Sequence, residues 1–229
     1  MRLFKWILNT LFPPYCVSCK TEGDFLCKKC VQSLVKKKIS PGRQSSQNPP
    51  EFQYLDGVIY ALDYAKNPQI KAAIEQFKYR FTEELAHYFG ELLAEKIGEL
   101  GMTQNRCIHL IPVPLHRKRL FYRGFNQAEL IAQALQKNSV THPVQIDSLL
   151  TRLRHTEQQA KLNRWERQNN LRNAFSLNKK FVQEGKEEAL YFLVDDVCTT
   201  GATLENCAKA LKENGFSKVY GLVVARAFR

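Results

Sequence analysis

Two adjacent carboxylates and a loop of threonines are the residues of this chain whose types and spacing suggest chemistry. Asp195 and Asp196 come directly after an apolar run, residues 190–194, of the kind that a strand buried on both faces shows. A small-residue loop, residues 198–203, follows them, and apolar residues then recur at helical spacing as far as Gly215, where a helix would stop. The pattern predicts a strand that ends at the acidic pair, then a tight loop, then a helix.

The loop has the composition of a phosphate site. The first backbone N–H groups of a helix are unpaired and lie at the positive end of its dipole. Small residues let a phosphate approach that backbone closely, and threonine hydroxyls add further donors. The two carboxylates have the wrong sign for phosphate, but they suit a pair of hydroxyls or a divalent cation beside it. The plainer alternative is a capped strand-turn-helix with an incidental acidic pair.

This stretch resembles the binding signature for phosphoribosyl pyrophosphate in type I phosphoribosyltransferases. That signature is an apolar strand, two acidic residues and a Thr-Thr-Gly-x-Thr loop. The resemblance implies that Asp195 and Asp196 hold the ribose 2′- and 3′-hydroxyls, with magnesium accompanying the phosphoribosyl donor. It assigns the 5′-phosphate to the loop residues Thr199, Thr200, Gly201, Ala202 and Thr203.

A second strand and loop repeat this geometry earlier in the chain. Residues 107–113 are a buried-strand candidate, and a helix capped by Asn126 begins soon after them. The loop between them carries four cations, Arg117, Lys118, Arg119 and Arg123. In a doubly wound sheet both loops would emerge at the C-terminal edge of the strands, where ligands bind. The resemblance implies that this loop, with Arg117 and Arg123, holds the pyrophosphate; a proline-rich turn with solvated arginines is the alternative.

Four cysteines near the N-terminus have the spacing of a zinc site. Cys16-x-x-Cys19 and Cys27-x-x-Cys30 place two thiolates on each of two turns, which together complete a tetrahedral four-sulfur site. Such a closed site is structural, so its loss would loosen residues 1–35 and leave the rest folded. Two disulfides or a redox pair are the alternatives, which a reducing compartment and the lack of a thioredoxin-like context disfavour.

Composition and charge indicate a small N-terminal module and a larger domain. The 229 residues contain 34 Lys and Arg against 22 Asp and Glu, and the formal net charge of +12 favours acidic partners. Residues 1–38 are predicted to hold an amphipathic helix and the four-cysteine finger, and residues 39–50 a proline-flanked linker. Residues 51–229 would form the phosphoribosyltransferase-like domain. The expected fold class is therefore α/β, a type I phosphoribosyltransferase-like parallel sheet preceded by a zinc ribbon.

The first twelve residues are apolar but differ from a signal peptide. Lys5, Asn9 and Thr10 interrupt the apolar run, and no small-residue cleavage site follows. The apolar residues form one helical stripe, which predicts a short helix docked on its own domain, with membrane-surface binding as the alternative. No other stretch is long or apolar enough to span a bilayer, so we expect a cytoplasmic protein.

Periodicity predicts the remaining elements. Strands are expected at 57–64 and 219–225, and a long amphipathic helix at 70–92 with a candidate interruption near Arg80. Lys78 lies beside the apolar stripe of that helix, where it is expected to flank the core. Residues 151–173 are dense in cations and fit a lid over the ligand site, a surface helix or a nucleic-acid contact.

Taken together, these features resemble the ComF competence protein family, which pairs an N-terminal zinc finger with a phosphoribosyltransferase domain. The Arg-Gly-Phe-Asn-Gln run at 123–127 adds to the resemblance, which spans nearly the whole chain. It implies a role in single-stranded DNA uptake or handling during natural transformation, with competence-machinery proteins as candidate partners of the finger. It implies no particular reaction.

Three functions are consistent with these residues, and the first two differ in the ligand of the phosphate pocket and in whether it is turned over. An active cytosolic phosphoribosyltransferase of nucleotide metabolism would displace pyrophosphate at the ribose C1 with an unidentified acceptor. A binding protein would keep the phosphate pocket, with a nucleotide phosphate or the DNA backbone as its ligand. On its basic surface aromatic side chains could stack on bases, and a role in the core is the alternative for these residues: Phe121, Tyr122, Phe125 and Trp165. In the third function, the finger and the first helix mainly dock protein partners, and the pocket acts as a regulator. The candidate DNA contacts are Lys36, Lys37, Lys38, Arg117, Lys118, Arg119, Arg123, Arg164 and Arg167.

Overall fold

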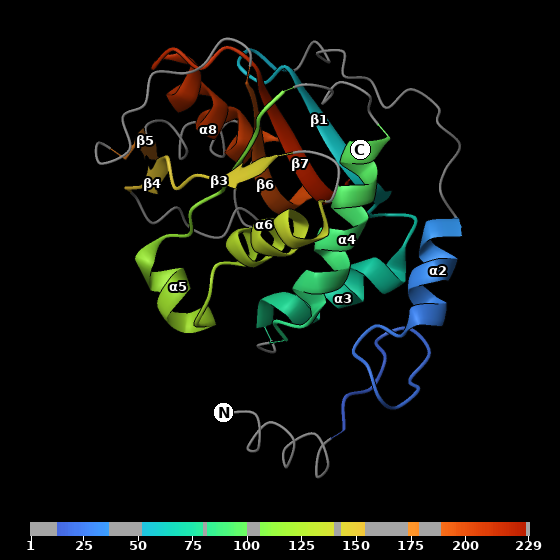
Figure 1. Ribbon diagram of the computed structural model, residues 1–229. Coiled ribbons are helices and arrows are strands. Elements are labelled where there is room, and N and C mark those ends of the chain that lie inside the picture. The colour runs from blue at the N-terminus through green and yellow to red at the C-terminus, as the bar shows by residue number, and fades with distance from the viewer. Residues whose placement is uncertain are drawn as a thin grey trace.

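A five-stranded sheet, parallel throughout, lies at the centre of the fold (Figure 1). The computed structural model describes residues 13–36, 52–79, 82–99, 106–139, 143–153, 174–178 and 189–227. The strand order is β1-β7-β6-β2-β3. In that order the strands are Gly57–Asp63, Val219–Arg226, Leu190–Cys198, Ile108–Pro112 and Val144–Ile146. The predicted α/β class with a parallel sheet is confirmed.

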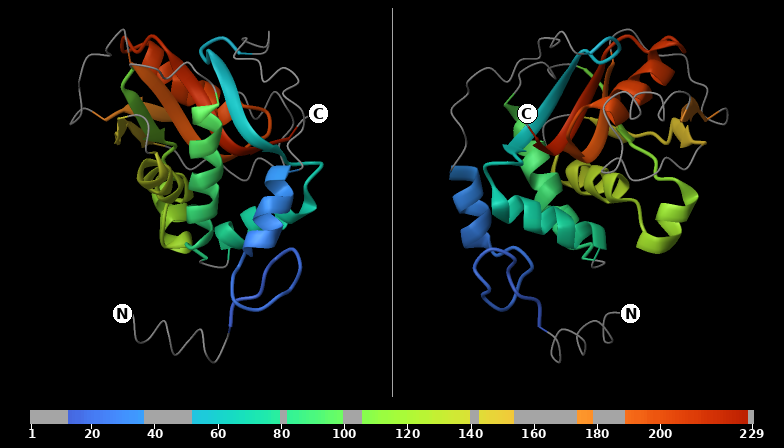
Figure 2. Two further views of the ribbon diagram at one scale, coloured as in Figure 1. Left: turned by 45° about the vertical axis from the view of Figure 1, so that its right-hand side comes forward. Right: turned by 180° about the vertical axis from the view of Figure 1, so that it is seen from behind.

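Helices cover both faces of the sheet, as the views in Figures 1 and 2 show. One face carries α3 (Pro68–Tyr79), α4 (Leu85–Gly98) and α6 (Gln127–Asn138), and the other carries α8 (Ala202–Lys212). Because successive side chains of a strand point to opposite faces, β6 contributes side chains to the hydrophobic core on each face of the sheet. Phe192 and Val194 pack in the core with α3, α4 and α6, whereas Tyr191 and Leu193 pack in the core with α8.

Smaller elements flank these layers. The helix α2 (Lys28–Lys36) begins directly after Cys27, contains Cys30 and lies beside α3 in both figures. The helix α5 (Arg117–Arg123) connects β2 to α6. A two-stranded antiparallel ribbon, β4 (Leu150–Arg152) with β5 (Phe175–Leu177), packs on the side of α8.

Two predicted boundaries differ from the structure. The strand β6 does not stop at the acidic pair, because its ladder with β7 continues through Asp195, opposite Val223, to Cys198, opposite Arg226. The four cations after β2 do not lie in a loop, because they form the helix α5. His116 caps that helix by accepting a hydrogen bond from the backbone N–H of Lys118, and Gly124 ends it in the left-handed conformation.

Other predictions agree with the structure or fall outside its described residues. The break near Arg80 is confirmed, because α3 ends at Tyr79 and α4 begins at Leu85. The first helix, Lys37 and Lys38, the linker at 39–50, and the segment 154–173 with Arg164 and Arg167 lie outside the described residues. Within the described ranges, no helix has both the length and the apolar character needed to cross a membrane.

Candidate functional site

The C-terminal edge of the sheet brings the two predicted ligand segments together. The ladder between β2 and β6 runs as far as Pro112, opposite Val194, and the backbone N–H of Val113 still donates to the carbonyl of Val194 at 3.0 Å. The chain after β2 enters α5, while β6 continues past this point with β7 as its neighbour. Asp195 and Asp196 therefore lie beside α5, at the edge where parallel strands present ligand-binding loops.

Asp196 is neutralised by a lysine on α3. It is buried, and its Oδ1 lies 2.7 Å from Nζ of Lys78. Burial alone would lower the pKa of Lys78, but the Asp196 carboxylate outweighs it and the pKa is raised. Lys78 thus does more than flank the core. Its position four residues after Ile74, within the apolar stripe of α3, was the signal that a buried partner was required.

Asp195 has different surroundings, because strand alternation turns it toward the face of α8. The side chain is half-buried, and its Oδ1 accepts a hydrogen bond of 2.8 Å from the backbone N–H of Asp196. Burial, followed by the negative charge of Asp196, raises the pKa of Asp195 to about 7, although Lys78 and Arg152 oppose the shift. A carboxyl poised near neutrality can change its proton occupancy when a cation or a hydroxyl approaches.

Arginines of α5 and β4 surround Asp195. Arg119 is half-buried, and burial together with the like charge of Arg123 lowers its pKa against the opposing effects of Tyr79 and Asp195. Burial also lowers the pKa of Arg152, with Arg119 adding to the shift and Asp195 opposing it. Sequence reasoning had not singled out Arg152, because nothing in its short strand marks it from the neighbouring cations.

The two arginines predicted to bind pyrophosphate have different environments. Arg123 is half-buried, its Nη1 donates to Oε1 of Gln127 at 3.0 Å, and its Cζ lies 5.3 Å from the centre of the Tyr79 ring. Arg117 is exposed, as is Lys118. The inward cations are therefore Lys78, Arg119 and Arg152, which interact with Asp195, together with Arg123, which interacts with Lys78 and Arg119. An anion of high charge density suits this group.

The threonine loop leads into α8 through a glycine in the left-handed conformation. Gly201 has a φ of +75°, and a Cβ at this position would lie 2.3 Å from the Phe52 ring. Only glycine fits both the left-handed backbone and this close approach. Gly201 is buried, Thr199 is exposed, and Thr200, Ala202 and Thr203 are half-buried. Oγ1 of Thr200 accepts from the backbone N–H of Ala202 at 3.4 Å, so the loop folds back on the start of the helix.

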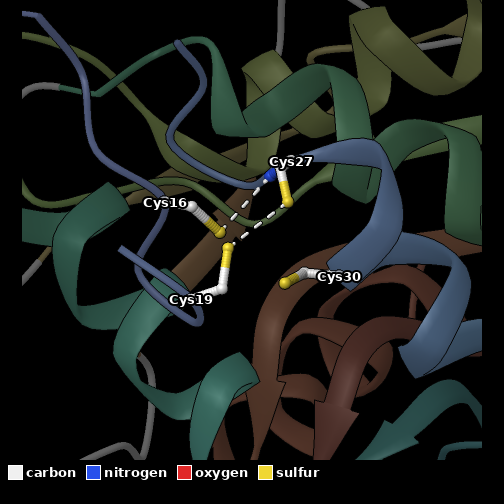
Figure 3. Close-up of side chains that lie close together, drawn as sticks. All are labelled: Cys16, Cys19, Cys27 and Cys30. Carbon is white, nitrogen blue, oxygen red and sulfur yellow. Dashed lines mark hydrogen bonds between the residues drawn. The ribbon is translucent and has the colours of Figure 1, made fainter. Parts of the chain in front are cut away.

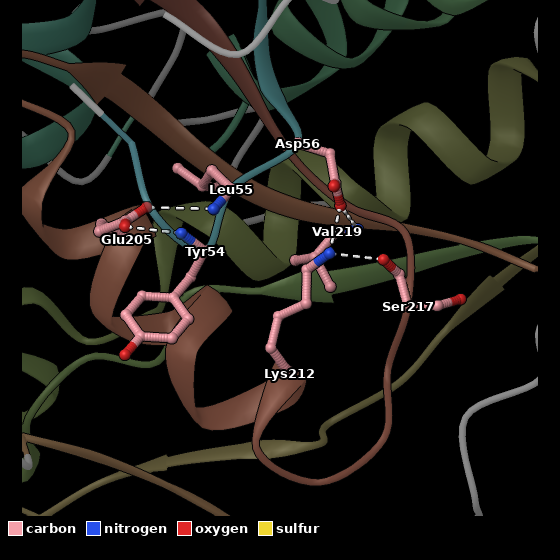
Figure 4. A network of polar contacts seen from close by, with 7 residues as sticks. All are labelled: Tyr54, Leu55, Asp56, Glu205, Lys212, Ser217 and Val219. Carbon is pink, nitrogen blue, oxygen red and sulfur yellow. Dashed lines mark hydrogen bonds and ion pairs between the residues drawn. The ribbon is translucent and has the colours of Figure 1, made fainter. Parts of the chain in front are cut away.

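A carboxylate of α8 fixes this loop to the beginning of the domain (Figure 4). Glu205 accepts hydrogen bonds from three consecutive backbone N–H groups, those of Gln53, Tyr54 and Leu55, at 2.6, 2.8 and 3.1 Å. Asp56 extends the connection, because its Oδ2 accepts from Nζ of Lys212 at 2.7 Å. The sequence carried no signal for these contacts, which join residues about 150 positions apart.

The four predicted metal-binding cysteines gather at one point (Figure 3). Their Sγ atoms all lie within 4.8 Å of one another, and those of Cys19 and Cys27 are 3.6 Å apart. A tetrahedral site with Zn–S bonds of about 2.3 Å has sulfur–sulfur edges of about 3.8 Å, so the cluster fits one metal ion. Hydrogen bonds lower the pKa of Cys19 to about 6, first from the Thr21 hydroxyl, 3.1 Å from the sulfur, then from the Thr21 backbone and the Cys16 and Cys27 thiols, and this favours the thiolate that binds metal.

The cysteine cluster packs against the larger domain. Cys16 and Leu26 are fully buried and belong to the same core as Phe77 and Phe89 of α3 and α4. Val31 of α2 is partly buried against that core. Metal binding is therefore connected through packing to α3, the helix that carries Lys78.

Comparison with known proteins identifies several relatives, although no model of a protein family matches the chain. The DNA utilization protein YhgH of Escherichia coli K12 is 32% identical over 196 residues, 85% of this chain and 81% of that protein. Competence protein F of Haemophilus influenzae is 29% identical over 219 residues, 93% and 85% of the two chains. Competence protein ComFC of Bacillus subtilis is 33% identical over 152 residues, 66% and 57% of the two chains.

Proposed function

Because this chain belongs to the ComF competence protein family, we propose that it handles single-stranded DNA in the cytoplasm during natural transformation. We further propose that it binds phosphoribosyl pyrophosphate, or a related phosphate ligand, at the C-terminal edge of its sheet. The names of the relatives, competence proteins and DNA utilization proteins, support the first part. The arrangement around Asp195 supports the second.

The observation that carries the pocket assignment is the placement of inward cations beside a carboxylate and a small-residue helix start. Phosphoribosyl pyrophosphate has a 5′-phosphate, a ribose diol and a pyrophosphate, and each needs a different environment. The loop at 199–203 with the N-terminus of α8 suits the 5′-phosphate. Asp195 suits the hydroxyls or a magnesium ion, which would neutralise the pyrophosphate charge when bound. Arg119 and Arg123 suit the pyrophosphate itself.

In this assignment the domain at 51–229 is phosphoribosyltransferase-like, and its residues bind and orient the ligand. Lys78 holds Asp196 and thereby fixes the end of β6. Glu205 holds the threonine loop in position through the segment 52–56. If the protein turns the ligand over, the inward cations would stabilise the charge that develops on departing pyrophosphate. This enzymatic alternative requires an acceptor.

The cysteine cluster completes the proposal as a structural zinc site. Four thiolates in tetrahedral reach prefer zinc among the common divalent ions, and a closed shell leaves no position for a substrate. Elemental analysis of the purified chain should find one equivalent of zinc. A folded chain that lacks metal would contradict this assignment.

Calorimetry with phosphoribosyl pyrophosphate and magnesium tests the pocket. Wild-type protein should bind the donor, whereas Asp195→Asn should bind it at least tenfold more weakly because a charged acceptor is lost. Glu213→Gln, on the exposed end of α8, is the control and should bind as wild type does. Equal binding by wild type and Asp195→Asn would remove the ribose assignment, and a screen of acceptor bases would then show whether any turnover occurs.

Titration of a labelled oligonucleotide at several salt concentrations tests the DNA role. Affinity should fall steeply with salt, because lysine and arginine side chains release counterions from phosphates. Binding should also survive saturation of the pocket with the phosphoribosyl donor, because a small pocket holds one ligand. A flat salt dependence, or complete displacement by the donor, would overturn the DNA role and leave the pocket assignment standing.

A further inference from the structure

We infer that the outer face of α5 is a stacking surface for single-stranded nucleic acid, built from Phe121 and Tyr122 and flanked by Arg117 and Lys118. This inference deepens the proposed function and rests on its DNA part. It assigns base contact to two named rings, separate from the cations of the pocket.

The exposure of these two rings carries the inference. Phe121 is 85% exposed and Tyr122 is 77% exposed, and no other large apolar side chain in the described ranges is as exposed as Phe121. Their ring centres are 5.9 Å apart, with planes at 78°. Phe125 behaves differently, because it is half-buried and packs on the core residue Phe77 at 5.7 Å. A role in the hydrophobic core therefore explains Phe125 but does not explain the exposed Phe121 and Tyr122.

The helix has two faces with different roles. Arg119 and Arg123 are four residues apart, so they share the face that is directed to Asp195. Phe121 and Tyr122 lie between them in sequence and project away from that face into solvent. A nucleic-acid strand on this outer face would therefore not contact the face of α5 that is directed to Asp195. This placement predicts that strand binding and pocket occupancy are compatible.

The charge of α5 selects the kind of partner. Its sequence, Arg-Lys-Arg-Leu-Phe-Tyr-Arg, contains four cations and no acid, and its two outermost cations, Arg117 and Lys118, are exposed. A single strand offers phosphates to the cations and base faces to the rings, and every base has such a face. An apolar protein surface would satisfy the rings but would leave the cations without partners.

Anisotropy with labelled single-stranded oligonucleotides and the full chain tests the inference. Phe121→Leu with Tyr122→Leu keeps apolar bulk but removes the aromatic faces, so affinity should fall about tenfold or more. The salt slope of this variant should match that of wild type, because no phosphate contact is lost. Arg117→Gln with Lys118→Gln should instead reduce the slope by about 0.7 per lost contact.

Controls separate stacking from other effects. Tyr15→Leu removes an aromatic ring that is 51% exposed in the cysteine module, the segment 13–36 that holds the four clustered cysteines. This variant should bind single-stranded DNA as tightly as wild type does. Tyr122→Trp enlarges the stacking face and should retain or increase affinity. If wild type binds no single-stranded oligonucleotide, the DNA part of the proposed function fails. If wild type binds and the leucine variant binds equally well, this inference alone is overturned.

Discussion

Asp195 and Asp196 are neighbours in sequence, yet strand geometry gives them different partners. Asp196 lies on the side of α3 and is paired with Lys78, whereas Asp195 lies on the side of α8 among arginines. The identity of both residues as site candidates was predictable, because two acids after an apolar run are conspicuous. Their separation was not, because it depends on the ladder with β7, which keeps β6 extended through the pair.

Stability should respond to the proton on Asp195. Its pKa of about 7 in the folded chain exceeds the value of about 4 expected after unfolding, so ionisation opposes folding between these limits. The free energy of unfolding therefore loses this contribution as pH rises from about 4 to about 8, with no further loss above. The Asp195→Asn side chain cannot ionise. At pH 8 the free energy of unfolding of this variant should therefore exceed that of wild type by about 2 kcal/mol, allowing for the partial exposure of the side chain.

Denaturant unfolding between pH 5 and 8.5 measures this difference. The gap between Asp195→Asn and wild type should be small at pH 5 and should widen toward pH 8. Asparagine keeps an oxygen that can accept from the backbone N–H of Asp196, so the substitution changes charge more than geometry. A gap that is independent of pH would show that the carboxyl is ionised throughout this range.

Lys78 and Asp196 should depend on each other. Lys78→Met or Asp196→Asn alone should lower the free energy of unfolding by on the order of 3 kcal/mol, because each leaves the other charge buried without its partner. The double variant should cost much less than the two single losses added together. Glu213→Gln breaks the exposed pair with Lys209 and should cost less than about 0.5 kcal/mol. Additive losses would place the two charges in separate environments.

At the scale of elements, the spacing of apolar residues predicted most of the central helices and strands. The strands β1, β2, β6 and β7 and the helices α3, α4, α6 and α8 follow from apolar spacing, because each buries one face or both. The strands β3, β4 and β5 were not predicted, because each has only three residues. The helix α5 was missed because it buries none of its seven residues and so has no apolar stripe. The attachment of segment 52–56 to α8 was also missed, because hydrogen bonds from Glu205 to three backbone groups depend on backbone position alone.

Gly201 should be intolerant of a side chain. Gly201→Ala places a methyl group against the Phe52 ring and strains a backbone at φ +75°, which together should cost on the order of 3 kcal/mol. Gly215→Ala is the matched control, because its φ is +88° with open space around it, and it should cost about 1 kcal/mol. Phe52→Leu in the Gly201→Ala background should recover part of the loss. Equal costs at the two glycines would exclude the contact with Phe52.

At the scale of the whole molecule, the cysteine module is part of the main core. The spacing of its four cysteines was enough to predict a metal site. The burial of Cys16 and Leu26 against α3 and α4 could not be predicted, because no sequence pattern links a finger to a particular helix. Their packing predicts that the consequences of metal loss reach beyond residues 1–35.

Removal of the proposed zinc should therefore loosen the domain. Cys16→Ser, or treatment with a chelator, should increase hydrogen exchange in α3 and α4 as well as in the cysteine module, because a fully buried part of the core is released. Cys107→Ser, at an exposed cysteine outside the cluster, is the control and should exchange as wild type does. Protection of α3 and α4 that is unchanged after metal loss would show that the module is energetically independent.

The strand order also has a consequence for biosynthesis. Among the described strands, β1 is hydrogen-bonded to β7 alone, and the residues before it are held by Glu205 of α8. A ribosome must therefore release residues 219–226 before β1 finds its partner, so the nascent chain carries an unpaired strand edge through most of its synthesis. Chaperones that bind exposed strands would bind this chain at β1. A truncation that removes β7 would leave the edge of β1 permanently unpaired.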